Sequence, residues 1–508
     1  MNALLNIKPI LDRPWIANIL SILAGSLFPL ALAPTNNWAL GLLSVFILFA
    51  LINASSAKSS ALSTALRCYL FALGMYGWGL YWIYVSIHVY GQAPKILAVG
   101  LVGLLVAFIS LPMLVQGYLH YRFFRFNLFA SILGFALLWA TREWLFTWVL
   151  TGFPWLFMGY GHLNSPLAAY APYLGVLGVG FLAILSAGLL YFLLCKTNLM
   201  DKILSTALLI SIWVLGLLLP SFILVEPEGE SITISIVQGN IDQNMKWRRD
   251  MVEPIIQRYL DLSDSEWGRD LIIWPEAAIT VFRDQAQGLL GSLDDKAKEE
   301  NSALLLGLPD RNERDEVFNA AIIVGRGTGL YHKRLLVPFG EYIPFDKQLR
   351  GLIKAFDLPM SRNIPGPKEQ GFLQVGDLSV ALSICYEIIY PDLLRRNKEV
   401  MDVLITISND TWFGTSIGPL QHMQIAQMRA LENGRYLLRG TNSGITAIVD
   451  PRGNIVDQLP QFQAEVLRGE IRSMKGRTPY NQFGDVLILS FIGMTLLCLM
   501  IWRFRYTR

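Results

Sequence analysis

The sequence is short of charge. Aspartate, glutamate, lysine and arginine make up only 16% of its 508 residues, whereas hydrophobic residues make up 53%. An average soluble protein has about 25% charged residues, so this composition favours a chain with several membrane-spanning segments. The formal net charge of +3 is small, which argues against the strongly basic surface that nucleic-acid binding requires.

Cysteine is scarce too. The four cysteines are Cys68, Cys195, Cys385 and Cys498, and no two of them form a C-x-x-C pair, which argues against a metal-binding or dithiol redox motif. Three lie in or beside apolar runs, where cysteine is usually a small buried hydrophobic residue. Cys385 alone lies in a long polar segment, so it is either structural or a nucleophile. We expect neither a cofactor nor a metal ion.

Eight apolar runs interrupt the sequence. A helix that crosses a bilayer needs about 20 apolar residues, and only the second run is clearly shorter, so we expect its helix to extend beyond the run. Residues 225–482 have ordinary soluble composition. The runs are Trp15–Ala33, Trp38–Ile52, Leu70–Ser86, Ile96–Leu119, Leu128–Val149, Tyr173–Leu194, Ile203–Leu224 and Val486–Trp502.

Basic residues are distributed unevenly between the connecting segments. If the N-terminus is cytoplasmic, the short outer loops carry little beyond Lys95. Lysine and arginine accumulate on cytoplasmic loops, so the bias predicts a multi-pass protein of the bacterial inner membrane, with both ends inside and residues 225–482 in the periplasm. The basic residues assigned to the inside are Lys8, Arg13, Lys58, Arg67, Arg122, Arg125, Lys196, Lys202, Arg503, Arg505 and Arg508.

These features predict three parts. Residues 1–226 form a seven-helix membrane domain, residues 227–482 form a periplasmic domain, and residues 483–508 form an eighth span with a cytoplasmic C-terminus. The first run ends in Ala31-Leu-Ala33, the pattern of a signal-peptide cleavage site. Its length and the spans that follow favour a retained helix.

Charged residues are rare inside the runs, and two of them are adjacent. Arg142 and Glu143 both lie in the fifth run. Neighbours on a helix do not face each other, so the two residues are not expected to pair. We expect Glu143 to face the interior of the helix bundle.

The polar segment alternates strand-like and helix-like stretches. This alternation favours a layered α/β sandwich. The predicted helices are Glu253–Ser263, Gly291–Asn301, Pro391–Lys398 and Pro419–Glu432. The predicted strands are Ser231–Val237, Leu271–Trp274, Ala303–Leu308, Leu378–Ile384, Val403–Ile407, Tyr436–Gly440 and Ile445–Val449, with a hairpin formed by Asn319–Val324 and Gly329–Tyr331.

Three predicted strands end in reactive side chains. They are the carboxylate of Glu276, the ammonium of Lys333 and the thiol of Cys385, and we expect them to meet at one edge of a sheet. A free thiol has a pKa of about 8.5, and a neighbouring cation and base would increase its reactive fraction. Taken singly, each residue has a structural interpretation. Glu276 could be a surface turn residue, Lys333 could belong to a solvated basic face, and Cys385 could be a core residue. The combination favours chemistry.

The stretches around these residues resemble the nitrilase, or carbon–nitrogen hydrolase, superfamily. Members of this superfamily carry a Glu–Lys–Cys triad on an αββα sandwich. The resemblance rests on Trp274-Pro-Glu276, Tyr331-His-Lys333, Pro338-Phe-Gly-Glu341, Ile384-Cys-Tyr-Glu387 and Ser408-Asn-Asp-Thr-Trp-Phe-Gly414.

With the apolar runs included, nearly the whole chain resembles the bacterial apolipoprotein N-acyltransferases. One departure is Thr411, where the pattern of that family has alanine. Threonine adds a methyl group and a hydroxyl beside the expected site. The further similar stretches are Trp82-Ile-Tyr-Val-Ser86 with His88, Glu143-Trp144, Gly152-Phe-Pro-Trp155, Val237-Gln-Gly-Asn240 with Lys246-Trp247, and Gly418-Pro-Leu-Gln-His422 with Arg429, Glu432, Gly434 and Arg435.

The resemblance implies a polytopic α-helical membrane protein of about eight transmembrane helices with an inserted αββα nitrilase-like domain. It also implies a two-step acyl transfer, in which Glu276 is the general base, Lys333 stabilises the oxyanion and Cys385 carries the acyl group. The backbone N–H of Tyr386 would assist Lys333. Supporting and substrate-binding roles are implied for Glu341, Glu387, Trp247 and Trp412; Trp247 could instead be an aromatic residue that packs on the membrane side.

The implied acyl donor is the sn-1 ester of a membrane phospholipid, and the implied acceptor is the α-amine of a diacylglyceryl-cysteine at the N-terminus of an apolipoprotein. A monomer and no nucleic-acid partner are expected. Three alternatives stay open. One is a membrane-tethered carbon–nitrogen hydrolase with the same triad. Another is a transporter or receptor, which would not need Cys385. The third is a cysteine protease that uses His332 or His422.

Overall fold

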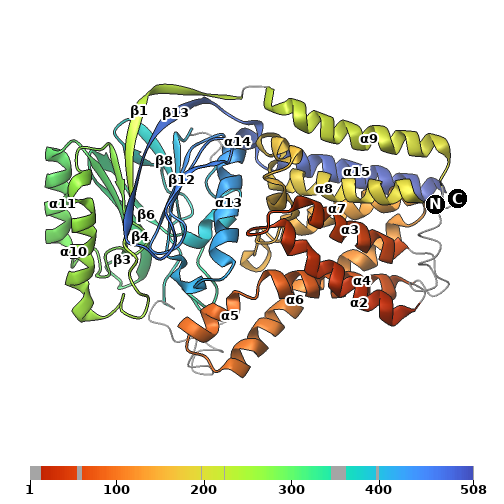
Figure 1. Cartoon of the computed structure of the whole chain (residues 1–508), viewed down its shortest axis with the longest axis horizontal. Coiled ribbons are helices and arrows are strands. Elements are labelled where there is room, and N and C mark those ends of the chain that lie inside the picture. The colour runs from red at the N-terminus through yellow and green to blue at the C-terminus, as the bar shows by residue number, and fades with distance from the viewer. Residues whose placement is uncertain are drawn as a thin grey trace. The chain divides into compact units, whose positions relative to one another are not determined.

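The computed structural model describes residues 13–53, 60–195, 197–221, 224–344, 362–395 and 400–506 (Figure 1). Contacts divide the chain into two units. The first contains the described residues up to Ile83, those from Ile96 to 221 and those from Phe483 onward, and the second contains Tyr84–Lys95 and Leu224–Gln482. The three-part division stays a prediction, and the short segment Tyr84–Lys95 belongs to the second unit.

The first unit is helical. Six helices in the described part of the chain are long and apolar enough to cross a membrane. A seventh candidate is α4 together with Ile83–Tyr90, which is bent by 57°, and α3 is shorter at 16 residues. The helices are α2 (Pro14–Leu27), α3 (Trp38–Asn53), α4 (Ala61–Gly79), α6 (Lys95–Phe124), α7 (Leu128–Leu145), α8 (Ala171–Leu194), α9 (Leu199–Leu218) and α15 (Val486–Tyr506).

The third apolar run differs from its prediction. The sequence predicts a continuous span over Leu70–Ser86, but α4 ends at Gly79 and the chain bends before α5 (Ile83–Val85) and the π-helix Ser86–Tyr90. Glycine lowers helix propensity by about 1 kcal/mol. Ending α4 at Gly79 therefore costs little helix stability.

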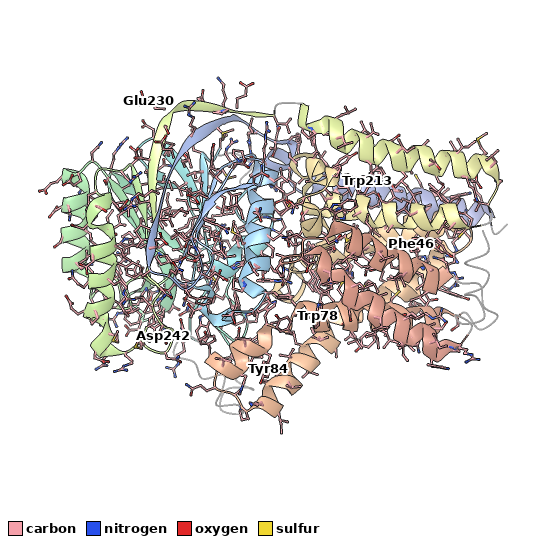
Figure 2. The ribbon with its side chains drawn as sticks, in the orientation of Figure 1. Phe46, Trp78, Tyr84, Trp213, Glu230 and Asp242 are labelled. Atoms are coloured by element: carbon pink, nitrogen blue, oxygen red, sulfur yellow. The ribbon has the colours of Figure 1, made fainter. Side chains whose placement is uncertain are left out.

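Small residues and aromatic rings hold the helices together. A Cβ added to Gly25 of α2 would lie 1.9 Å from the carbonyl oxygen of Phe71 on α4, so glycine is required at this crossing, as is common between membrane helices. Figure 2 shows aromatic side chains along the helices of this unit, including Trp213 of α9, whose ring packs 5.2 Å from that of Trp38.

Glu143 faces the bundle interior, as predicted. Its side chain is fully buried, and its Oε1 accepts hydrogen bonds from Trp139 Nε1 at 2.8 Å and from the backbone N–H of Met158 at 3.0 Å. Arg142 points elsewhere and donates to the hydroxyl of Tyr76 at 2.9 Å. Glu143 therefore ties α7 to the short 3-10 helix Met158–His162.

The second unit is an αββα sandwich, as predicted (Figure 1). One sheet has the strand order β13-β1-β2-β3-β4-β6, and the other has the order β12-β11-β10-β9-β8-β7-β5. The strands are β1 (Val225–Gln238), β2 (Leu271–Ile273), β3 (Ala303–Arg311), β4 (Val317–Gly325), β5 (Gly327–Thr328), β6 (Leu330–His332), β7 (Leu373–Val375), β8 (Leu378–Ile384), β9 (Val403–Ser408), β10 (Leu437–Thr441), β11 (Ala447–Val449), β12 (Ile455–Gln458) and β13 (Glu465–Gly476).

Apolar layers lie between and outside the two sheets. Ile273 of β2, Ile384 of β8 and Ile405 of β9 belong to the core between them. Two helices, α10 (Val252–Ser263) and α11 (Gln287–Glu299), cover the outer face of the first sheet, and α13 (Gly418–Asn433) packs on β10 of the second. The strands β1, β2 and β3 run parallel, as do β8, β9 and β10. Their carboxyl ends carry the loops that form the site.

The second unit differs from the prediction at four strands that were not predicted, β5, β7, β12 and β13, and at one predicted helix. Strand β1 extends back to Val225 and pairs antiparallel with β13, a strand that the sequence analysis missed because its polar residues leave no continuous apolar run. The predicted helix Pro391–Lys398 is absent from its described residues, because 391–394 form turns; residues 396–399 lie outside the described part. A single helical turn is costly to nucleate, so the short polar stretch does not propagate a helix there.

Candidate active site

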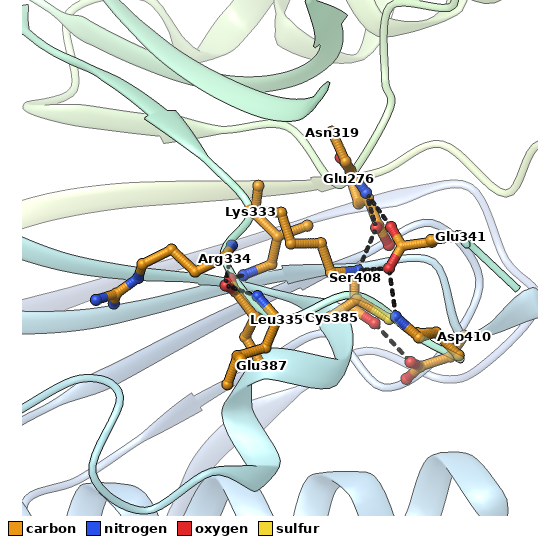
Figure 3. Close-up of polar contacts among 12 residues, drawn as sticks. Glu276, Asn319, Lys333, Arg334, Leu335, Glu341, Cys385, Glu387, Ser408 and Asp410 are labelled. Carbon is orange, nitrogen blue, oxygen red and sulfur yellow. Dashed lines mark hydrogen bonds and ion pairs between the residues drawn. The ribbon is translucent and has the colours of Figure 1, made fainter. Parts of the chain in front are cut away.

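The three predicted strand-end residues come together from two sheets. Glu276 follows β2 and Lys333 follows β6 in the first sheet, whereas Cys385 follows β8 in the second (Figure 3). The expectation that they share one sheet edge is therefore wrong. Facing sheets lie about 10 Å apart, which a glutamate and a lysine side chain together can span. The site thus lies between the layers of the sandwich.

Cys385 occupies a strained backbone turn. It begins the 3-10 helix Cys385–Ile389 directly after β8, with φ of +54°, a conformation that is uncommon for residues other than glycine. Two hydrogen bonds hold the turn. Glu387 Oε2 accepts from the backbone N–H of Ile384 at 2.8 Å, and His422 Nε2 lies 3.2 Å from the carbonyl oxygen of Cys385.

Glu387 also fixes the distance between Cys385 and Lys333. Its Oε1 accepts from the backbone N–H groups of Arg334 at 2.6 Å and Leu335 at 3.1 Å, and the Tyr331 hydroxyl donates to both of its oxygens at 3.0 Å. Burial raises the pKa of Glu387, although these N–H donors and nearby cations favour the ionised form. This one buried side chain therefore joins the turn after β8 to the segment after β6.

Glu276 and Glu341 share a lysine and an amide. Lys333 Nζ lies 2.8 Å from Glu341 Oε2 and 3.5 Å from Glu276 Oε1. Asn319 Nδ2 donates to Glu276 at 2.7 Å and to Glu341 at 2.9 Å (Figure 3). Burial alone would lower the pKa of Lys333, but Glu341 and Glu276 outweigh it and raise that pKa. Asn319, on β4, is a site residue that the sequence analysis missed, because its only signal is an amide in an otherwise apolar strand.

The thiol is neutral at rest. Burial raises the pKa of Cys385 to about 12, and the carboxylate of Glu276 contributes to the rise, while Lys333 opposes it. The expectation that the neighbours increase the thiolate fraction is therefore wrong for the resting site. Formation of the thiolate requires a base that takes the proton, and Glu276 is the carboxylate most strongly coupled to the thiol.

A buried polar cluster lies beneath Cys385. Ser408 donates to Asp410 Oδ1 at 2.6 Å, and Arg439 Nη2 lies 2.7 Å from Asp410 Oδ2 and 3.0 Å from His422 Nδ1. His422 Nδ1 also lies 3.1 Å from Asp410 Oδ1, and His422 Nε2 faces the carbonyl oxygen of Cys385. Burial would raise the pKa of Asp410, but Arg439 and His422 hold it well below its usual value. The sequence analysis included Ser408 and Asp410 in a matching stretch without giving them a role, and it missed Arg439.

The described contacts of both histidines of the protease alternative go to groups other than the thiol. His422 contacts the carbonyl of Cys385. His332 Nε2 lies 2.8 Å from Asp310 Oδ2, and its ring stacks on Phe318 with centroids 4.4 Å apart. Both imidazoles are engaged in other contacts.

The remaining predicted residues lie around this centre. Tyr386 is buried, and its ring meets that of Tyr390 edge to face at 5.5 Å. Trp247 is half-buried. Trp412 is half-buried too, its ring lies 6.0 Å from that of Tyr90, and its carbonyl accepts from Ser86 at 2.8 Å. The substrate contacts of Trp247 and Trp412 stay predictions.

Thr411 is accommodated by hydrogen bonds. Its hydroxyl donates to Asn409 Oδ1 at 2.8 Å, lies 2.6 Å from the hydroxyl of Ser443, and accepts from Asn442 Nδ2 at 3.1 Å. The extra hydroxyl is thus part of a polar network that joins the loops after β9 and β10, and it does not disturb them.

Comparison with known proteins identifies both parts of the chain. The carbon-nitrogen hydrolase family model matches residues 233–480, and that of the apolipoprotein N-acyltransferase N-terminal domain matches residues 24–189. Among solved structures, a CN-hydrolase superfamily protein from Xanthomonas campestris is 18% identical with a TM-score of 0.38, covering 54% of this chain and 97% of that chain. A carbon-nitrogen hydrolase from Helicobacter pylori is 14% identical with a TM-score of 0.35, covering 52% and 94%.

Curated relatives extend over nearly the full length. The apolipoprotein N-acyltransferase of Pseudomonas aeruginosa is 41% identical over 97% of both chains. That of Pseudomonas putida is 42% identical over 93% of this chain and 94% of its own, and that of Photobacterium profundum is 37% identical over 96% and 97%. Since similarity at this level runs through the membrane helices and the sandwich alike, this chain belongs to the apolipoprotein N-acyltransferase family of membrane-embedded enzymes that acylate lipoproteins.

Proposed function

We propose that the enzyme transfers the sn-1 acyl chain of a phospholipid, by way of a thioester on Cys385, to the α-amine of an N-terminal S-diacylglyceryl-cysteine. The products are a triacylated lipoprotein and a lysophospholipid. The observation that carries this proposal is a neutral, buried thiol coupled to the carboxylate of Glu276, which is itself held by Asn319 and Lys333.

In the first step Glu276 takes the thiol proton as Cys385 Sγ attacks the ester carbonyl carbon. The carbonyl oxygen becomes an oxyanion, which Lys333 and the backbone N–H of Tyr386 stabilise. Loss of one such donor typically costs about 3–4 kcal/mol of transition-state stabilisation. The bond from carbon to the glycerol oxygen then breaks, Glu276 returns the proton to that oxygen, and lysophospholipid leaves. The acyl group remains on sulfur.

In the second step the acceptor amine attacks the thioester. An α-amine has a pKa of about 7.7–8.0, so much of it is protonated at neutral pH and must first release one proton to water. Glu276 then takes a second proton from the neutral amine as its nitrogen attacks. The carbon–sulfur bond breaks as the amide forms, and the proton returns to the sulfur of Cys385. Glu341 orients Lys333, as their 2.8 Å ion pair supports.

The membrane helices allow the acyl chains of both substrates to remain in the bilayer during the reaction. Moving acyl chains into water costs about 0.8 kcal/mol per CH₂, so a site next to the bilayer avoids this cost. We place the sandwich in the periplasm, above the outer leaflet of the inner membrane, because basic residues gather in the connecting segments that this orientation assigns to the cytoplasm. Trp247 and Trp412 are proposed to contact the acyl chains.

A labelled phospholipid tests the proposal. The purified full-length enzyme is incubated with a phospholipid that is radiolabelled at the sn-1 acyl chain, without an acceptor. We expect a label on the protein that hydroxylamine removes, that is lost in Cys385→Ala and that is kept in the matched control Cys498→Ala, since Cys498 lies exposed on α15. An unlabelled wild-type enzyme that still acylates a lipopeptide would refute the thioester.

The same incubation separates the transferase from a membrane-tethered carbon–nitrogen hydrolase. A transferase retains the acyl group until a diacylglyceryl peptide is added and then forms an amide. Continuous release of free fatty acid without acceptor, or ammonia from added amides, would instead indicate a hydrolase.

A further inference from the structure

Lys246 is a buried ammonium with no carboxylate partner. It lies in the turn after β1, only 1% exposed. The single hydrogen bond that its ammonium makes in the described part of the chain goes to the backbone carbonyl oxygen of Glu276 at 3.1 Å, and no carboxylate of that part lies within 4.0 Å of Nζ. Two of its three N–H donors therefore have no described acceptor. An unpaired buried charge is costly, so its position calls for a role.

Lys333 cannot supply all the positive charge that the reaction needs. Its ammonium is already paired with Glu341 at 2.8 Å and Glu276 at 3.5 Å. Two ionised carboxylates and one ammonium leave this buried group with one negative charge, which disfavours a thiolate beside it. Lys246 brings the group to neutrality, and it does so both before and after the proton moves from Cys385 to Glu276.

We infer that Lys246 is the charge-compensating residue of the active site, which holds the turn of Glu276 and stabilises the negative charge that forms at Cys385. The inference deepens the proposed function and rests on its assignment of Glu276 and Cys385. Lys246 reaches Glu276 through that residue's backbone and acts on the sulfur through space.

The electrostatics of the site agree with this geometry. Burial lowers the pKa of Lys246 to about 8, while the charges of Glu276 and Cys385 act in the opposite direction. The charged groups that act most strongly on Cys385 are Glu276, Lys333 and Asp410, and Lys246 interacts with Cys385 as well. Asp410 is neutralised by its own arginine at 2.7 Å. Among the described lysine side chains of this site, Lys246 is thus the one that has no carboxylate in an ion pair with it.

A series of substitutions separates the charge of Lys246 from its hydrogen bond. Lys246→Arg retains both the charge and the donor, Lys246→Gln retains a donor without charge, and Lys246→Met removes both. Lys475→Met is the matched control, because the side chain of Lys475 is 72% exposed. The readout is the pH dependence of Cys385 alkylation by iodoacetamide in a background with the other three cysteines replaced, measured without lipid.

We expect Lys246→Met and Lys246→Gln to move the alkylation profile upward by about 1–3 pH units, the usual effect of losing one opposite charge, which slows alkylation roughly 10- to 1,000-fold at a fixed pH. Lys246→Arg and Lys475→Met should stay within about threefold of wild type. If Lys246→Met does not fold, the glutamine variant carries the test.

A wild-type pH profile of alkylation in both Lys246→Met and Lys246→Gln would overturn the inference. A shifted profile in Lys246→Met alone would overturn it too, because it would show that only the hydrogen bond of Lys246 matters. These outcomes are independent of the proposed acyl transfer, because no lipid is present. Failure of the wild-type enzyme to form a thioester would refute the proposed function and leave the alkylation comparison standing.

Discussion

Asp410→Asn should destabilise the sandwich strongly, because Asp410 is the carboxylate partner of Arg439. Both side chains are fully buried, and Arg439 Nη2 lies 2.7 Å from Asp410 Oδ2. At this distance and an effective dielectric constant of about 20, the attraction is roughly 6 kcal/mol. Most of that offsets desolvation, but removal of one partner of a buried pair typically costs about 3–5 kcal/mol.

The partner substitution should cost less. Arg439 cannot lose its proton, and its Nε and Nη1 already have no acceptor in the described part of the chain, so Asp410→Asn leaves a full charge stranded. Asp410 can instead take up a proton once Arg439→Met removes the cation. In wild type the pKa of Asp410 lies below its usual value, so its stabilising effect is present at neutral pH and is lost as pH falls. In Arg439→Met the pKa rises, so the defect should shrink as pH falls toward 5.

Thermal unfolding of the detergent-purified enzyme measures both effects. For a domain of this size, 1 kcal/mol corresponds to about 2–4 °C, so Asp410→Asn should lower the melting temperature by roughly 6–20 °C. The double variant Asp410→Asn with Arg439→Met should recover most of the loss, since a buried ion pair can often be replaced by uncharged residues. A melting temperature within 2 °C of wild type for Asp410→Asn would refute the reasoning, as would strictly additive losses in the double variant.

Three further changes test the contacts around Cys385 and in the helix bundle. Glu276→Gln should lower kcat by about 10²–10⁴-fold, the usual contribution of a general base, and abolish the lipid label while the melting temperature stays close to wild type; retained label would contradict the base assignment. Glu387→Gln should cost about 1–3 kcal/mol of stability, because its amide turns a donor toward N–H groups that need an acceptor; unchanged melting and activity would count against it. Glu143→Leu should cost a similar free energy of unfolding, since Trp139 Nε1 and the N–H of Met158 lose their shared acceptor. Glu143→Gln should retain much of the wild-type stability, because its amide oxygen can still accept. Equal melting temperatures for both variants and wild type would show that Glu143 does not brace the helix bundle.

The three residues to which we assign chemistry could be located in the sequence because each follows a short strand. Glu276, Lys333 and Cys385 follow β2, β6 and β8, and the strand signal is local in the sequence. What the sequence could not reveal is which sheet each strand joins. That choice is made by long-range pairing, such as β8 with β9, and it decided that the thiol faces the carboxylate across the sandwich.

Residues that hold the site in place were harder to find than those that react. Asn319 contributes an amide from within β4, and Arg439 an arginine from within β10, positions that sequence patterning assigns to the core. Each is recognisable only when its partners are known: two carboxylates for Asn319 and Asp410 for Arg439. Tertiary contacts, which leave no periodic trace in the sequence, define these roles.

The raised pKa of Cys385 links nucleophile formation to the arrival of substrate. A preformed thiolate would lie between Glu276 and Asp410, where both charges oppose it. In the proposed mechanism the thiol stays protonated until an ester carbonyl can accept its electron pair, so the proton transfer to Glu276 and the attack would occur together. Water that attacks the proposed thioester would also need Glu276 as its base. Amine and water would therefore compete for one carboxylate, and we expect an apolar approach that favours the lipid-anchored amine to decide the outcome.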